Sequence, residues 1–187
     1  MKKGRIFVIS APSGSGKTTI CKKVLEQVKN ITPSVSFTTR SPRKGEKNKE
    51  DYHYLPEKEF KEEVRRDNVL EWEENFGYLY GTPKRPVLEK LEEGKDVLLS
   101  IDVKGAREIK KKFPKSILIF IKPPSIEELR RRLKVRNTDD ENEIAKRLEF
   151  AKDELSHIRE YDYVVANDEL TRAVREVISI IETERSN

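Results

Sequence analysis

The pattern of hydrophobic and polar positions changes abruptly after the first ten residues of the chain. Residues 6–9 form an uninterrupted apolar run rich in β-branched side chains, which predicts a buried strand. A loop of small residues follows, and from Lys17 onward apolar residues recur at helical spacing, which predicts a helix over about 17–29. A strand, a glycine-containing loop and a helix in this order are the setting of a phosphate-binding P-loop.

The loop residues suit that chemistry. Main-chain N–H groups can converge on an anion only where side chains stay clear, as Gly14 and Gly16 allow, and the positive end of the helix dipole faces the same point. Lys17 adds a full charge, and the Thr18 hydroxyl is placed to bind Mg²⁺. The strict pattern asks for glycine where Ala11 stands, a change that is tolerated if φ stays negative. The alternative is a small-residue turn that binds nothing. We predict that ATP phosphates bind at Ala11, Pro12, Ser13, Gly14, Ser15, Gly16, Lys17, Thr18 and Thr19.

The spacing of apolar residues is different over residues 34–82. Short alternating runs predict strands over 34–39, 51–55, 69–72 and 76–80, with a turn at 75–77. An exposed loop is expected over 40–50, and a helix from Pro56 to about Asp67. This segment is therefore interpreted as a small β-rich insertion.

The remainder alternates strands with helices. Continuous apolar runs over 96–101 and 116–121 are typical of buried parallel strands, and a last strand is expected over 163–166. Helices are expected over about 84–93, 103–112 and 169–183. Another helix is expected after Pro123–Pro124, where Ser125 and Glu128 form a capping box, and a long helix beyond the polar loop that follows it is expected to run to about Arg159. This alternation predicts an α/β protein with a parallel sheet.

Composition excludes several classes. The chain has 187 residues and a net charge of +5, but acidic and basic residues alternate along most expected helices, as on a solvated face, so nucleic-acid binding is disfavoured. One cysteine, Cys21, excludes an intramolecular disulfide and a cysteine-based zinc site. No apolar stretch approaches the length of a membrane span, and we expect a cytoplasmic protein. The charged fraction of 39% is typical of proteins from hot environments.

Two further groups are candidates for chemistry. Asp102 ends a buried strand, where a second Mg²⁺ ligand is expected near a P-loop, although it would also serve as a helix N-cap. Arg40 and Arg43 present two guanidinium forks in one loop, and Tyr52 and Tyr80 can donate hydroxyl groups to the same anion. Taken alone, that stretch would equally suit a solvated charge run with core tyrosines.

Several motifs together resemble one family. They are S-V-S-F-T-T-R-S-P-R-K-G-E (34–46), E-D-Y-H-Y (50–54), L-E-W-E-E-N-F-G-Y-L-Y-G-T (70–82), I-D-V-K-G-A (101–106), R-N-T-D (136–139) and A-N-D (166–168). In order and spacing they closely resemble the guanylate kinases, over nearly the whole chain. The family's P-loop also commonly reads S-A-P-S-G-x-G-K, which accounts for Ala11.

The resemblance implies the P-loop nucleoside monophosphate kinase fold, a three-layer α/β fold with a central parallel sheet. It implies CORE segments at 1–33, 83–123 and 151–187, a GMP-binding insertion at 34–82 and a helical LID at 124–150. The implied reaction is ATP- and Mg²⁺-dependent phosphorylation of GMP to GDP, a step in GMP recycling and GTP supply. The implied partners are ATP and GMP, and dGMP as an expected further substrate, with no nucleic acid or membrane.

The resemblance also assigns residues. It places Arg40, Arg43, Tyr52 and Tyr80 on the GMP phosphate, and Ser36, Glu71 and Thr82 on guanine. An ionised Glu71 suits guanine, because N1–H and the N2 amino group are both donors, whereas adenine would leave the carboxylate facing a lone pair. Ser100 and Asp102 are also assigned to GMP binding. Many relatives have an acidic residue where this chain has Ser100, so the acidic group that would assist at guanine or the metal is missing here.

In the LID, the resemblance places Arg136 near adenine and the phosphates and Arg147 on the transferring phosphoryl group, while Asn167 approaches adenine. The expected catalytic residues are Lys17, Arg43, Arg136 and Arg147, and Arg130, Arg131 and Arg132 are expected on a helix surface. Two alternatives remain: a kinase for another nucleoside monophosphate, and a non-enzymatic module that binds phosphorylated peptides. Such modules typically lose the P-loop lysine or glycines, which this chain keeps.

Overall fold

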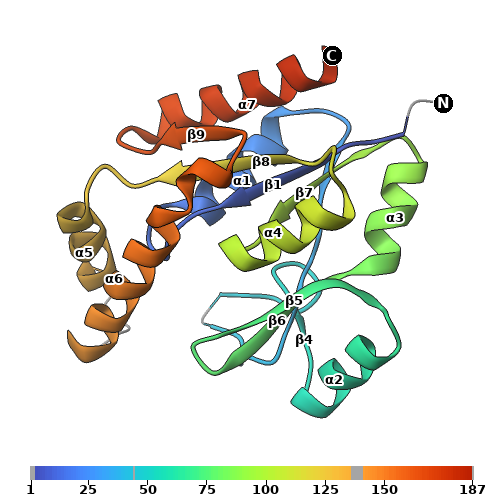
Figure 1. Cartoon of the computed structure of the whole chain (residues 1–187), viewed down its shortest axis with the longest axis horizontal. Coiled ribbons are helices and arrows are strands. Elements are labelled where there is room, and N and C mark those ends of the chain that lie inside the picture. Colours follow the sequence, from blue (N-terminus) through green and yellow to red (C-terminus); the bar gives the residue numbers. More distant parts are fainter. Residues whose placement is uncertain (1–2, 44, 136–140, 187) are drawn as a thin grey trace. The chain divides into compact units, whose positions relative to one another are not determined.

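The computed structural model of the chain describes residues 3–43, 45–135 and 141–186, which fall into two compact units (Figure 1). Unit 1 comprises 1–6, 30–99 and 104–116, and unit 2 comprises 7–29, 100–103 and 117–187. The fold is α/β, as the alternation of strands and helices predicts, and each unit contains parallel strands.

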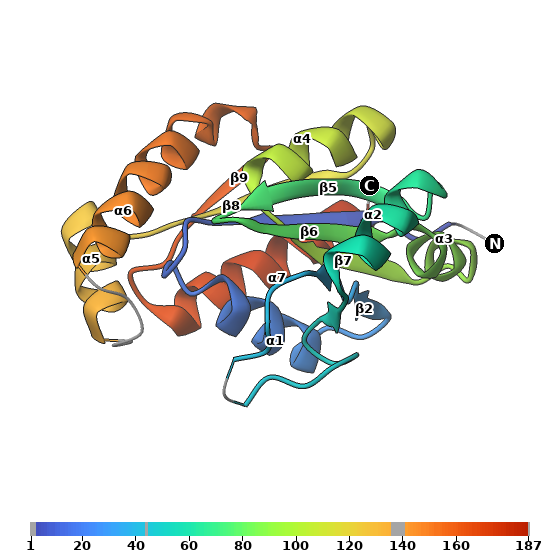
Figure 2. The ribbon, with the colours of Figure 1, turned by 90° about the horizontal axis from the view of Figure 1, so that it is seen from below.

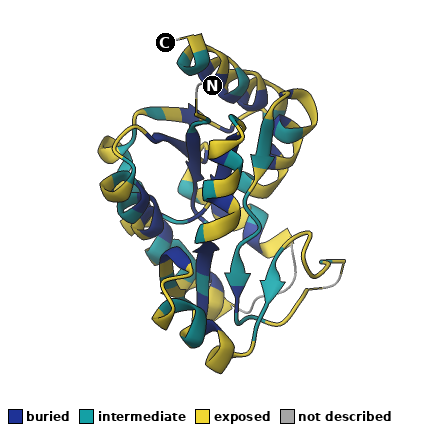
Figure 3. Ribbon diagram, turned by 90° about the vertical axis from the view of Figure 1, so that its right-hand side faces the viewer, coloured by how far each residue is buried: buried dark blue, intermediate teal, exposed yellow. Residues whose placement is uncertain are grey.

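Unit 2 is built on three parallel strands, β1 (Ile6–Ser10), β8 (Ile117–Lys122) and β9 (Tyr163–Ala166). Phe7 is in register with Ile117, and Ile119 with Tyr163. All five residues of β1 and the first five of β8 are buried, which explains their unbroken apolar sequence (Figure 3).

The helices of unit 2 are α1 (Lys17–Gln27), α5 (Ile126–Val135), α6 (Glu141–Ser156) and α7 (Leu170–Ser186), with a short 3₁₀ helix at Ile158–Glu160. Helices α1 and α7 lie side by side (Figure 2). The buried residues of α7 repeat at helical spacing, because only one face is covered: Ala173, Val174, Val177, Ile180 and Ile181. The Glu128 N–H donates to Ser125 Oγ over 3.1 Å, which confirms the expected cap of α5.

Unit 1 contains a parallel pair, β2 (Ile31–Pro33) with β7 (Asp96–Ser100, of which Ser100 belongs to unit 2), and helices α3 (Lys84–Glu92) and α4 (Val103–Lys112, of which Val103 belongs to unit 2). It also contains a separate four-stranded sheet in the order β4-β3-β6-β5. Its strands are β3 (Phe37–Thr38), β4 (His53–Tyr54), β5 (Val69–Asn75) and β6 (Tyr78–Pro83).

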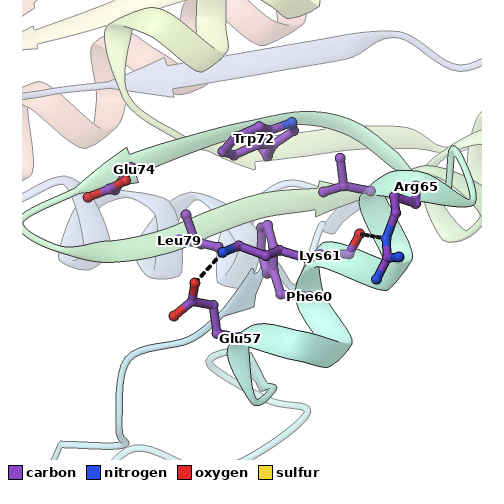
Figure 4. Close-up of a pocket in the computed structure, with 8 residues that line it drawn as sticks. Glu57, Phe60, Lys61, Arg65, Trp72, Glu74 and Leu79 are labelled. Atoms are coloured by element: carbon purple, nitrogen blue, oxygen red, sulfur yellow. Dashed lines mark hydrogen bonds and ion pairs between the residues drawn. The ribbon is translucent and has the colours of Figure 1, made fainter.

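Helix α2 (Glu57–Arg65) lies over this second sheet through Phe60, which is fully buried and packs edge-on against Trp72 with ring centroids 6.4 Å apart (Figure 4). Strands β5 and β6 are joined at Phe76 and Gly77, which have φ values of 53° and 77°. Two consecutive residues with positive φ suit the right-handed twist of a tight hairpin. The turn expected at 75–77 is therefore present.

The strand prediction differs from the structure at several places. The strand expected over 34–39 is reduced to Phe37–Thr38 and the one over 51–55 to His53–Tyr54, and β2, which ends at Pro33, was not predicted. Proline lacks an N–H, but this removes no ladder bond when the residue lies at an edge or strand end. Strands β5 and β6 are also longer than expected, and α6 ends at Ser156. Among the described helices, none is long and apolar enough to cross a membrane.

Candidate nucleotide-binding sites

The P-loop of unit 2 follows β1 directly and leads into α1. Gly14 and Gly16 have φ values of 92° and 90°, a region that glycine enters at no steric cost. Ala11 is buried and is not among the residues with positive φ, so alanine fits this position without strain. The loop therefore has the backbone conformation that its two glycines predicted.

Lys17, the first residue of α1, is bonded to the segment 100–103 of the same unit. Its ammonium group donates to the carbonyl of Ile101 over 3.1 Å. Close by in the chain, the Ser10 hydroxyl donates to the carbonyl of Asp102 over 3.3 Å. These two bonds tie the P-loop lysine and the end of β1 to the 101–102 segment, where Asp102 was expected as the second Mg²⁺ ligand beside Thr18.

Helices α5 and α6 contribute the rest of the donor half. Arg147 donates to the Ser13 hydroxyl over 3.1 Å, so the arginine expected at the transferring group lies at the P-loop. Leu129 and Leu133 of α5 pack against Gly14, and a Cβ there would lie 3.1 Å and 3.2 Å from their methyl carbons. Arg136 lies outside the described residues.

Four other residues of the donor half differ in their exposure and contacts. Asn167 is buried, and its amide donates to the main-chain carbonyl of Ser15 over 2.7 Å. Thr18 and Thr19 are exposed at the start of α1. Arg132, expected on a helix surface, is only partly exposed and donates to the carbonyl of Asn167 over 3.3 Å.

One acidic residue of this half was missed by the sequence analysis. Glu154 of α6 is 5% exposed, and burial raises its pKa to about 8; Lys17 lowers this pKa while Asp102 and Asp153 raise it. These electrostatic couplings connect Glu154 with the lysine and the acidic residue expected at the nucleotide. The only sequence signal was a glutamate on the apolar face of a predicted helix.

The arginine loop of unit 1 is organised around a carboxylate that the sequence analysis also missed. One guanidinium nitrogen of Arg40 donates to both oxygens of Glu46, over 2.9 Å and 3.0 Å. The main-chain N–H of Arg43 and the hydroxyl of Tyr54 donate to the same carboxylate, over 2.7 Å and 2.8 Å. We call Arg40, Arg43, Glu46 and Tyr54 the arginine cluster.

The environment of the arginine cluster shifts the pKa values of Glu46 and Tyr54. Partial burial alone would raise the pKa of Glu46, but the bonds from Arg43, Tyr54 and Arg40 outweigh it and the pKa is lowered. Burial and the adjacent Glu46 raise the pKa of Tyr54 to about 12. Glu46 is therefore a carboxylate, and Tyr54 a neutral donor, across the physiological range.

The two tyrosines expected at the acceptor phosphate adjoin this cluster. The guanidinium carbon of Arg40 lies 5.5 Å from the centre of the Tyr52 ring, within the range of a cation–π contact. The rings of Tyr52 and Tyr80 are 6.1 Å apart, nearly edge to face. The structure thus brings three of the four expected phosphate-binding side chains together, and the main chain of the fourth, Arg43, joins them through Glu46.

The expected guanine-reading residues lie on the hairpin and before β3. Glu71 and Thr82 are both buried, and the Thr82 hydroxyl donates to the Glu71 carboxyl group. Ser36 is partly buried, and its carbonyl accepts the N–H of His53 over 2.8 Å. Ser100 is exposed in unit 2, where its hydroxyl contacts Cys21.

A separate hollow of about 410 Å³ lies between α2 and the hairpin (Figure 4). Its floor is apolar, with Phe60, Trp72 and Leu79, and its rim carries Glu57 and Lys61 as an ion pair. None of the expected site residues lines this hollow.

The sequence and fold define an α/β protein of the P-loop class that also carries the arginine cluster. A family model described as guanylate kinase matches residues 3–184. The chain is 49% identical to a guanylate kinase of Caldanaerobacter subterraneus subsp. tengcongensis and 46% identical to one of Thermotoga maritima, each over 98% of this chain and 89% of the relative.

Among solved structures, the guanylate kinase of Anaplasma phagocytophilum superposes with a TM-score of 0.85 at 35% identity, covering 100% of this chain and 88% of that one. The chain belongs to the guanylate kinase family.

Proposed function

We propose that this chain transfers the γ-phosphoryl group of ATP to GMP, giving ADP and GDP. Membership of the guanylate kinase family supports the reaction, and the buried Glu71–Thr82 pair carries the choice of base. A carboxylate held in place by Thr82 can accept both the N1–H and the N2 amino group of guanine. Adenine offers an acceptor at N1, so its binding would place a lone pair against the buried carboxylate where guanine places two donors.

The donor half binds the phosphates of ATP through the P-loop. The main-chain N–H groups of residues 13–17 and the N-terminus of α1 supply aligned partial positive charge. Lys17 and Arg147 supply full charges, and Arg136 is assigned to the same group by the family resemblance. On ATP binding, the Lys17 ammonium exchanges its bond to the Ile101 carbonyl for the phosphate oxygens.

The acceptor half binds the phosphate of GMP through Arg40, Arg43, Tyr52 and Tyr80. Glu46 and the Tyr52 ring restrict the Arg40 side chain, which is 11% exposed. Because the guanidinium group is positioned before the ligand arrives, less side-chain entropy is lost on binding. This arrangement favours a doubly charged monophosphate.

Mg²⁺ fits the oxygen donors present. The described residues hold no group of three or more His, Cys, Asp and Glu side chains that could bind a metal by themselves. Mg²⁺ normally retains waters and binds to one or two protein oxygens together with nucleotide phosphates. Thr18 and Asp102 would hold it, with Ser100 nearby in sequence. Bound to ATP, Mg²⁺ neutralises charge on the phosphates.

The catalytic contribution of the protein is alignment and charge neutralisation. A phosphate oxygen of GMP is already an adequate nucleophile, so no general base is needed. Lys17, Arg43, Arg136 and Arg147 would neutralise the charge spread over the transferred group, and exclusion of water would prevent hydrolysis of ATP. We expect dGMP to serve as well, and a cytoplasmic location.

A coupled assay tests this proposal with ATP and each of GMP, AMP, UMP and dTMP. The wild-type protein should use GMP, and Glu71→Gln should lower the GMP-to-AMP ratio of kcat/KM by about 5- to 100-fold, because roughly 1–3 kcal/mol follows from one mismatched buried group. Glu74→Gln, on the same strand but exposed, is the matched control. An unchanged ratio in Glu71→Gln would show that the base is selected elsewhere.

A further inference from the structure

Asn167 lies directly after β9, far from the P-loop in sequence but in contact with it. Its side-chain N–H donates to the main-chain carbonyl of Ser15 over 2.7 Å, in a fully buried hydrogen bond. Its own main-chain N–H donates to the carbonyl of Lys122, over 2.9 Å. The residue is 5% exposed, so the amide is fixed between the sheet and the loop.

Gly16 shows how close this contact is. A Cβ on Gly16 would lie 2.5 Å from the Asn167 amide nitrogen, a distance that real carbon atoms do not tolerate. Gly16 also has a φ of 90°. The glycine is therefore required twice, once for its backbone conformation and once to admit the asparagine amide.

The hydrogen bond from Asn167 to the Ser15 carbonyl also fixes the orientation of the next main-chain N–H, that of Gly16. In a planar trans peptide, the C=O of one residue and the N–H of the next point in opposite directions. Because the Ser15 carbonyl is directed at Asn167, the N–H of Gly16 is directed to the other side of the same peptide plane. In a P-loop this N–H is one of the donors that converge on the phosphates.

We propose that Asn167 is a positioning residue of the donor site, which orients the Ser15–Gly16 peptide so that the Gly16 N–H faces the bound phosphates. This role rests on the proposed use of ATP, and it does not involve the adenine ring that the family resemblance assigned to Asn167. The contribution of Asn167 to binding should therefore be the same for any ligand that carries the polyphosphate, with or without a base.

The test compares ATP with inorganic tripolyphosphate, which has no base, by isothermal titration of the full chain. In Asn167→Ala, both ligands should bind about 5- to 20-fold more weakly, because a buried hydrogen bond is lost and a main-chain donor is misdirected. Asn167→Asp should be at least as weak, because a carboxylate repels the Ser15 carbonyl. Asn68→Ala, which removes an exposed amide from unit 1, is the matched control and should bind both ligands normally.

Two results would overturn this assignment: weakened ATP binding with unchanged tripolyphosphate binding, which means that Asn167 contacts the base, or no weakening of either ligand. Circular dichroism and a thermal melt of the same variants report on the folding of the whole chain, including unit 2, which carries Asn167. If Asn167→Ala does not fold, the nearly isosteric Asn167→Asp decides in the same binding assay. Wild-type tripolyphosphate binding without phosphorylation of GMP would refute the proposed function and leave the role of Asn167 testable.

Discussion

The P-loop and the arginine cluster are both suited to bind phosphate, but they use different parts of the chain. The P-loop presents main-chain N–H groups from consecutive residues, and its two glycines have φ values near 90°. The arginine cluster presents side chains from separated positions, Arg40, Glu46 and Tyr54 among them, around one carboxylate. A main-chain site is specified locally, whereas a side-chain site needs an internal counter-charge to hold its arginines.

This difference predicts different consequences of side-chain substitution in the P-loop and in the arginine cluster. Removing a side chain from the P-loop leaves its N–H groups in place and isolates the contribution of one charge. Removing the central carboxylate of the arginine cluster should disorganise several groups at once, because Glu46 accepts hydrogen bonds from three residues. Substitutions at Lys17, Glu154 and Glu46 measure these contributions separately.

The largest effect is expected for Lys17→Ala. Its turnover should fall by at least about a thousandfold, the range seen when one electrostatic stabiliser of a transition state is lost. Steady-state kinetics with saturating ATP and GMP measures it, with Lys23→Ala on the exposed face of α1 as the control. Turnover within tenfold of wild type would contradict the role of Lys17 as the charged group of the donor half.

The next effect is the pH dependence of stability. The contributions of Glu154 in the donor half and Glu46 in the acceptor half should change with pH in opposite directions. The pKa of Glu154 is raised to about 8 by burial, so between about pH 4.5 and pH 8 the folded chain holds a proton that the unfolded chain releases. Stability is therefore lost as pH rises through this window. The pKa of Glu46 is lowered, so its contribution is present above the ordinary glutamate pKa and is lost as pH falls.

Glu154→Gln isolates the contribution of the Glu154 carboxyl group to the pH dependence of stability. Relative to wild type, the variant should gain stability on the order of a few kcal/mol between pH 5 and pH 8, because it has no buried carboxyl group to ionise. Urea unfolding at the two pH values, without nucleotide or metal, measures the change. Glu149→Gln, on the exposed side of α6 and not among the groups that shift the Glu154 pKa, should show no such gain. Parallel pH profiles for wild type and Glu154→Gln would refute the raised pKa.

The smallest of the three effects is expected for Glu46→Gln. The KM for GMP should rise about 10- to 100-fold, from the roughly 1.5–3 kcal/mol of hydrogen bonds to a charged group, while the KM for ATP stays unchanged. Glu50→Gln, exposed in the same loop, is the control. Tighter GMP binding by Glu46→Gln would show that Glu46 competes with the phosphate for Arg40 instead of positioning it.

The same contrast explains what could be predicted from the sequence. The P-loop conformation follows from neighbouring residues, so Gly14, Gly16 and Lys17 identified it directly. The organising role of Glu46 depends on Tyr54 and Arg40 meeting it in space, and the role of Asn167 depends on a carbonyl 152 positions away in the chain. Neither relation leaves a local pattern. Strand β2 was missed for a similar reason, since a proline at its end is compatible with pairing to β7 only through the tertiary arrangement.

Gly14 shows that a ligand is not the only reason for a glycine in such a loop. A methyl group there would lie 3.1 Å and 3.2 Å from the Leu129 and Leu133 side chains, which would have to move by a few tenths of an ångström to admit it. The residue is thus constrained from outside by the hydrophobic core as well as from inside by the anion. Because core packing by itself favours glycine at position 14, this glycine is weaker evidence for catalysis than the lysine three residues later.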